Sequence, residues 1–162
     1  MTVMGERIVG ISEYALSADP AEVLVTYSLG SCVGLMLYDP VVGIAGLLHA
    51  MMPLSSSNPA KAAANVAMYA DTGASALLGE MFQAGATRAN LIAKVAGASS
   101  QLDQGQMFRI GQRNHAVVRK VLWKNGILIA AEDVGGSVSR TVYLEVGSGR
   151  THVKSEGTLR EL

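Results

Sequence analysis

The longest apolar stretch of the sequence, residues 32–54, is interrupted by Asp39-Pro40. The runs on either side, residues 33–38 and 41–52, are rich in Val, Ile and Leu, which favour β-strands. An Asp-Pro pair is typical of a turn, so the two runs predict two strands joined by a tight connection. Neither half reaches the roughly 20 apolar residues that a membrane-spanning helix requires, so we expect no membrane insertion.

Further strands and two helices are predicted around this pair of strands. Apolar residues at three- and four-residue intervals predict one helix over residues 61–83 and another over 111–124. Residues 99–106 are expected to form a polar loop. The other expected strands are a weak one around residues 8–14 and clearer ones at 22–27, 91–95, 127–131, 141–146 and 151–154. This order predicts an α+β fold in which mixed β-sheet layers are flanked by two main helices.

The composition predicts one compact domain spanning residues 1–162. A chain of 162 residues that is 49% hydrophobic and 16% charged can bury roughly two-thirds of its unfolded surface without disulfides or a structural metal. Basic and acidic residues are equal in number, 13 each. A nucleic-acid or anionic-membrane surface needs a clustered basic excess, so we expect neither kind of partner.

The N-terminal residues predict a cytoplasmic protein. Residues 1–10 include Glu6 and Arg7 and never reach the apolar run of a secretory signal peptide. In the cytoplasm the single cysteine, Cys32, is expected to stay reduced.

The sequence lacks the motifs of several kinds of chemistry. One Cys and three scattered His form neither a Cys-x-x-Cys pair nor a His-Glu-x-x-His helix, so we expect no metal site. The glycine-rich nucleotide motifs are also missing, and we expect no cofactor. The neighbouring carboxylates Glu132 and Asp133 lie in a predicted strand region and should point to opposite faces. Cysteine chemistry is what remains.

Cys32 is the candidate nucleophile. A lone cysteine is more often a small buried apolar residue than a reactive group. However, Cys32 follows Gly30-Ser31 at a break between two predicted strands, where glycine permits unusual backbone angles. Neighbouring backbone N–H groups at such a corner can converge on one point, so Gly30 and Ser31 are candidate residues of an oxyanion hole.

His49 and Thr26 are the candidate partners of this cysteine. His49 lies 17 positions after Cys32, and antiparallel pairing of the two strands brings its imidazole back beside the start of the first strand. A core histidine bonded to backbone is the ordinary alternative. Thr26 carries a hydroxyl on a preceding strand and can orient the base, although a β-branched strand residue needs no such role. We expect His115 and His152 at the surface.

Short motifs that include these residues lie in order along nearly the whole chain. They are Val25-Thr26, Leu29-Gly30-Ser31-Cys32-Val33, Asp39-Pro40, His49 in a His-x-Met-x-Pro segment ending at Pro53, Tyr69-Ala70-Asp71, Lys94-Val95-Ala96-Gly97-Ala98, Ile110-Gly111-Gln112-Arg113-Asn114, and Glu132-Asp133-Val134-Gly135-Gly136 followed by Arg140. In these motifs the chain resembles the CheD family, the chemoreceptor glutamine deamidases of bacterial and archaeal chemotaxis.

The resemblance implies a specific activity. It makes Cys32 the nucleophile, His49 the base and Thr26 the third member of a papain-like triad, on a fold similar to bacterial deamidase toxins. The implied substrates are selected glutamine side chains of methyl-accepting chemotaxis receptors, and the phosphatase CheC is an implied partner. A non-catalytic module that regulates CheC or the receptors by docking is the alternative. A redox sensor is a weaker one, because no second Cys can resolve a sulfenic acid.

Overall fold

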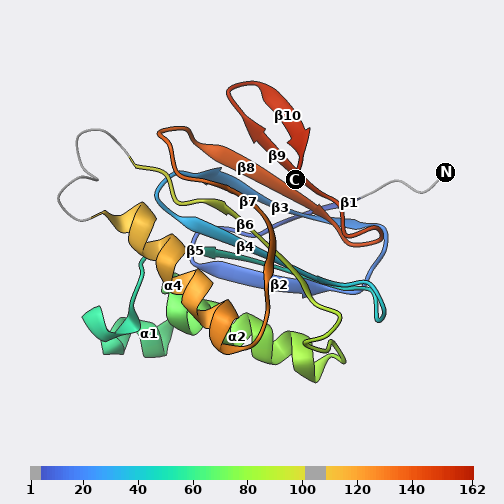
Figure 1. The fold of residues 1–162 in the computed structure, drawn as a ribbon, viewed down its shortest axis with the longest axis horizontal. Helices are drawn as coiled ribbons and strands as arrows, with labels where there is room; N and C mark the ends of the chain where they lie inside the picture. The colour runs from blue at the N-terminus through green and yellow to red at the C-terminus, as the bar shows by residue number, and fades with distance from the viewer. Residues whose placement is uncertain (1–4, 101–108) are drawn as a thin grey trace.

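The computed structural model describes residues 5–100 and 109–162, which form two mixed β-sheets and a layer of helices (Figure 1). The first sheet has the order β1 (Gly5–Ile8), β3 (Glu22–Leu29), β8 (Arg140–Glu145), β9 (Thr151–Ser155) and β10 (Thr158–Glu161). The second has the order β2 (Glu13–Ser17), β5 (Ile44–Ala50), β4 (Val33–Asp39), β6 (Ile92–Gly97) and β7 (Ile129–Val134). The expected α+β class with mixed sheets is confirmed, since β1–β3 and β6–β7 pair in parallel and the other pairs are antiparallel.

The predicted hairpin across Asp39-Pro40 forms the centre of the second sheet. β4 and β5 pair antiparallel, with Gly34 opposite His49 and Asp39 opposite Ile44. The Asp39 carboxylate is fully buried and closes the turn, because Oδ1 accepts from Val41 N at 2.8 Å. Its Oδ2 accepts from Thr87 N at 3.0 Å, which connects this turn to the loop that follows the helix at residues 70–83.

Both faces of the second sheet are covered, which explains why β4 and β5 are almost continuously apolar, with Asp39 and His49 as exceptions. One face packs against the first sheet through a core that includes Leu24, Val142 and Leu144 on one side and Met36 and Leu47 on the other. The opposite face packs against the helices. A strand covered on both faces reads as a continuous hydrophobic run rather than an alternating one.

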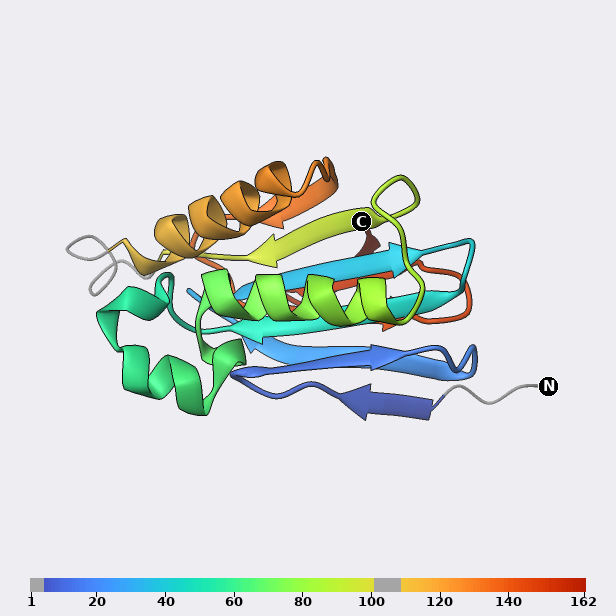
Figure 2. The same ribbon diagram turned by 90° about the horizontal axis from the view of Figure 1, so that it is seen from below.

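Two main helices lie side by side on that second face (Figure 2). α2 (Ala70–Gln83) packs across β5 and β2, and α4 (Ile110–Lys124) packs beside it over β4 and β7. α4 matches the predicted helix and ends before Gly126, whose φ of +71° is accessible to glycine. Among the described helices, none has the length and apolar character needed to cross a bilayer.

The prediction of one helix over residues 61–83 is wrong. The segment divides into α1 (Pro59–Ala64), a 3₁₀ turn (Val66–Met68) and α2. The Asn65 side chain accepts from Ala67 N and begins the turn, which ends α1. Met68 O then accepts from the N–H groups of Met51 and Met52, so this segment bonds to the chain that leaves β5.

The remaining strand predictions agree in place but not in extent. The weak N-terminal strand is two strands, β1 and β2, and the strand expected at 127–131 is β7, which begins at Ile129. β10 was not predicted. Most of the expected polar loop, residues 101–106, lies outside the described residues.

Candidate functional site

His49 and Thr26 meet between the two sheets. His49 is on β5 of the second sheet and Thr26 is on β3 of the first, and both side chains are fully buried. Their Nδ1 and Oγ1 atoms are 2.7 Å apart, and Thr26 Oγ1 lies 2.6 Å from the carbonyl oxygen of Val9. A hydroxyl has one proton and a carbonyl can only accept, so Thr26 donates to Val9 and accepts from His49 Nδ1–H.

This arrangement defines the protonation of His49. With the proton on Nδ1, the neutral ring carries a lone pair on Nε2. Nε2 is buried and has no hydrogen-bond partner among the described residues. Burial also lowers the pKa of His49 from 6.5 to about 4, so the ring is neutral near neutral pH. A buried acceptor without a partner costs about 1–3 kcal/mol, which a purely structural histidine would avoid.

Cys32 lies on the same face of the second sheet as His49. It precedes Gly34 by two residues, and Gly34 is directly opposite His49. Cys32 O accepts from Ala98 N at 2.8 Å, which extends the β4–β6 register to Cys32. Side chains two apart on a strand share a face, and the Cys32 side chain packs against the core between the sheets. Cys32 is therefore a diagonal neighbour of His49 on this face of the sheet.

Burial favours the neutral form of both the Cys32 thiol and the His49 imidazole. Cys32 is partly exposed, and burial raises the pKa of its thiol more than the backbone N–H of Cys32 lowers it. The pKa of His49 moves in the opposite direction for the same reason. Both shifts therefore favour the uncharged forms of the two groups.

The turn that carries Cys32 is held through its carbonyl groups. Gly30 O accepts from Ser99 N at 2.9 Å, and Ser31 O accepts from Asn114 Nδ2 at 2.9 Å. The turn begins after Ser28, whose φ of +58° is unusual for a residue other than glycine, at an irregularity in the β3–β8 pairing. Asn114 lies in the motif at residues 110–114 and is not among the predicted site residues.

The other two histidines lie elsewhere. His115 and His152 are each partly exposed and paired with a carboxylate, Glu132 at 2.8 Å and Glu145 at 3.7 Å respectively. Asp133, the neighbour of Glu132, instead bonds Arg140 on the other side of β7, so the two carboxylates point to opposite faces as predicted. In the parts of the chain that the structure describes, no three His, Cys, Asp or Glu side chains gather closely enough to hold a metal ion.

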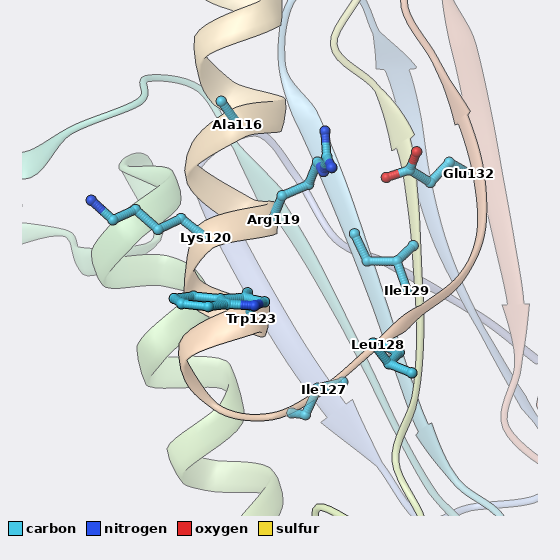
Figure 3. A pocket seen from close by; sticks show the side chains of 8 residues that line it. All are labelled: Ala116, Arg119, Lys120, Trp123, Ile127, Leu128, Ile129 and Glu132. Carbon is cyan, nitrogen blue, oxygen red and sulfur yellow. The ribbon is translucent and has the colours of Figure 1, made fainter.

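A groove of about 680 Å³ lies away from these residues, between α4 and the start of β7 (Figure 3). The side chains that line it are Ala116, Arg119, Lys120, Trp123, Ile127, Leu128, Ile129 and Glu132. Trp123 and Leu128 are 76% and 86% exposed. None of the candidate residues Cys32, His49 and Thr26 borders this groove.

Known proteins resemble the chain over almost its entire length. A family model described as CheD chemotactic sensory transduction matches residues 51–155. A protein of Solibacter usitatus named "Probable chemoreceptor glutamine deamidase CheD" is 47% identical over 159 residues, which is 98% of this chain and 94% of that protein. The chain belongs to the CheD family. CheD proteins of Syntrophus aciditrophicus and Pyrococcus horikoshii are 47% and 38% identical, each over 98% of this chain and 100% and 98% of their own length.

The family model begins after Cys32 and His49, whereas the alignments with these CheD relatives cover almost all of the chain. Among solved structures, the hypothetical protein YfiH of Bacillus licheniformis aligns with a TM-score of 0.50 and 16% identity, over 76% of this chain and 49% of that one. This CheD-family chain thus spans about half the length of YfiH, and the likeness concerns the fold alone.

Proposed function

We propose that this protein is a chemoreceptor glutamine deamidase, which converts glutamine side chains of methyl-accepting chemotaxis receptors to glutamate and releases ammonia. The relatives named above carry this activity in their names. One observation carries the chemistry: Thr26 holds His49 with Nε2 free, on the face of the sheet where Cys32 lies. Cys32 is then the nucleophile, His49 the base and Thr26 the residue that orients it.

Attack on the glutamine begins with proton transfer. His49 Nε2 takes the proton of the Cys32 thiol as the sulfur attacks the carboxamide carbon, because a thiolate is the competent nucleophile. The resulting imidazolium keeps its Nδ1–H bond to Thr26. Negative charge develops on the carboxamide oxygen, where backbone N–H groups of the turn at Gly30, Ser31 and Cys32 can stabilise it.

Collapse of the intermediate releases ammonia. His49 returns the proton to the leaving nitrogen, and the carbonyl remains bound to Cys32 as a thioester. A water molecule then attacks the thioester, giving a proton to Nε2, and this proton passes to the departing sulfur. The product is a glutamate, the thiol is restored and no cofactor is consumed. On a receptor helix the new carboxylate alters repulsion between neighbouring helices and provides a methylation site.

The arrangement is papain-like in its roles, with a Cys nucleophile, a His base and a third residue on the far ring nitrogen. We propose that the fold is related in this respect to bacterial deamidase toxins and that the chain acts as one domain in the cytoplasm, where Cys32 stays reduced. CheC is the further partner that the family resemblance implies.

The test is conversion of glutamine in a purified receptor fragment, followed by mass spectrometry of its peptides. The wild-type protein should convert specific glutamines to glutamate. Cys32→Ala, which changes the side-chain volume little, should reduce the rate by at least roughly 10³-fold, since removal of a catalytic nucleophile abolishes the covalent route. Equal background conversion by both proteins would refute the proposal.

A docking function is the second candidate. It is favoured by two exposed apolar side chains, Trp123 on α4 and Leu128 after it. In that case Cys32→Ala leaves receptor signalling intact, whereas a deamidase loses it. Complementation of a strain that lacks the gene with Cys32→Ala separates these two functions. The variant can still dock, but it cannot carry out the reaction.

A further inference from the structure

In the turn that carries Cys32, the carbonyl groups of residues 30–32 each accept a hydrogen bond. Ser99 N, Asn114 Nδ2 and Ala98 N donate to the carbonyl oxygens of three successive residues, at 2.9, 2.9 and 2.8 Å. These residues are Gly30, Ser31 and Cys32. Their own N–H groups, in contrast, donate to no acceptor of another residue within residues 5–100 and 109–162, although the Cys32 N–H contacts its own sulfur. The turn is therefore fixed on its acceptor side and free on its donor side.

Peptide geometry couples these two sides. The carbonyl of Ser31 and the N–H of Cys32 belong to one planar peptide unit, in which they point in opposite directions when the bond is trans. No peptide bond in the described part of the chain is cis. Whatever holds Ser31 O consequently sets the direction of the Cys32 N–H group, a donor that stands next to the attacking sulfur.

Asn114 is the group that holds Ser31 O. Its side chain is fully buried on α4, and Nδ2 also donates to Met51 O at 3.1 Å. Met51 directly follows β5, two residues after His49. The two protons of one amide thus connect the turn of the nucleophile to the strand of the base.

The start of α4 is shaped for this contact. A Cβ atom at Gly111 would collide with the carbonyl oxygens of Ala98 and Ser99, so only glycine lets the helix approach this closely. Asn114 follows one turn later on the helix and faces the same way. Its Oδ1 is buried without a partner among the described residues, which costs stability. Packing alone would favour an apolar residue here.

We propose that Asn114 is a positioning residue of the deamidation reaction. By holding the Ser31–Cys32 peptide plane against the base strand, it directs the Cys32 N–H toward the oxygen that becomes negatively charged. The inference rests on the proposed function for its substrate, but the same oxyanion forms when the thiol attacks any acyl group. Alkylation of the thiol forms no oxyanion, so the two kinds of reaction separate this role from effects on the thiol itself.

The test compares wild type, Asn114→Ala and the control Val118→Ala in three reactions. Val118 is also fully buried on α4, one turn beyond Asn114, so its loss lowers thermal stability without touching the turn. The reactions are deamidation of a receptor fragment, acylation by p-nitrophenyl acetate, and alkylation by iodoacetamide as a function of pH. Removing one oxyanion donor costs roughly 10²–10³-fold, and misdirecting it should cost about 10–100-fold.

Asn114→Ala should therefore lower the kcat of deamidation and the rate of acylation by that factor, with KM and the alkylation profile nearly unchanged. Val118→Ala should retain all three rates. Full activity of Asn114→Ala would overturn the inference, as would a parallel fall in alkylation or an equal fall in Val118→Ala. If Asn114→Ala does not fold, Asn114→Leu has a similar shape, lacks both donors and is read in the same way.

The two proposals fail separately. If wild type converts no receptor glutamine but Asn114→Ala still slows acylation and spares alkylation, the substrate is wrong and the positioning role stands. If wild type deamidates receptors and Asn114→Ala does so equally well, the positioning role is wrong and the enzyme stands.

Discussion

The site between the sheets and the groove beside α4 contrast in almost every property. His49 and Thr26 are fully buried and hydrogen bonded, and only Cys32 reaches the surface. The groove is open, lined by exposed Trp123 and Leu128 together with cationic side chains (Figure 3). The groove is an open space that none of the proposed catalytic residues Cys32, His49 and Thr26 borders.

The contrast shows that the groove and the proposed catalytic residues lie in different places on the molecule. A small-molecule enzyme must enclose its ligand, so its reactive groups line a cavity. A deamidase that acts on a protein has to admit one carboxamide only. Its nucleophile can stand at the rim, with the base behind it in the core, where burial keeps the imidazole neutral.

Substitution of one histidine in each region gives the largest expected difference in activity, with His49 in the site and His115 beside the groove. His49→Gln removes the proposed base and should lower kcat/KM for receptor deamidation by roughly 10³-fold or more. His115 contacts Glu132, one of the groove residues, and His115→Gln should stay within about twofold of wild type because it touches none of the reacting groups. Kinetics with the receptor fragment measure both, and comparable losses would move the chemistry to the groove.

The central hairpin, with Cys32 just before its first strand and His49 on its second, follows from the sequence for a local reason. Asp39-Pro40 defines the turn, and antiparallel register then places residues 17 apart on neighbouring strands. The division of the strands into two sheets does not follow in this way. A β-branched strand such as β3 carries no signal that it belongs to the other sheet, so the contact across the interface had to come from the structure.

Two further features were not predicted. At Asn65 the side chain caps a 3₁₀ turn, a local signal that the helical periodicity of the flanking residues hides, and Met68 O is held by the chain beyond β5. Asn114 occupies one turn of a well-predicted helix, and its partners Ser31 and Met51 are 83 and 63 residues away. Long-range contacts of one buried amide are invisible to periodicity and propensity.

The acid dependence of stability should differ between wild type and His49→Gln. The pKa of His49 is about 4 in the folded protein against 6.5 as its ordinary value, so between these pH values the unfolded chain binds a proton that the folded protein does not. The free energy of unfolding that His49 contributes is complete above pH 6.5. It falls by about 3 kcal/mol as the pH decreases toward 4. Urea unfolding at several pH values measures it, and identical pH slopes for both proteins would contradict a buried neutral ring.

Thr26→Val should have a smaller effect. The change keeps the shape, but it leaves His49 Nδ1–H and the carbonyl of Val9 without their partner. We expect about 1–3 kcal/mol lower stability and a kcat reduced about 10–100-fold, because the ring loses its fixed tautomer. Thr151→Val is the matched control, since Thr151 is also buried and its hydroxyl has no partner among the described residues. If Thr26→Val and Thr151→Val lose the same stability and activity, Thr26 has no role in orienting His49.

The smallest expected effect belongs to the groove. Trp123→Ala removes a side chain that is 76% exposed, so the free energy of unfolding should change by no more than about 0.5 kcal/mol. Acylation by p-nitrophenyl acetate should be unchanged, because the groove does not border Cys32. The receptor fragment provides the sharper measurement. An unchanged KM would mean that the reactive turn alone recognises the glutamine, whereas a raised KM with unchanged kcat and acylation would divide the molecule into a buried region for chemistry and an exposed one for docking.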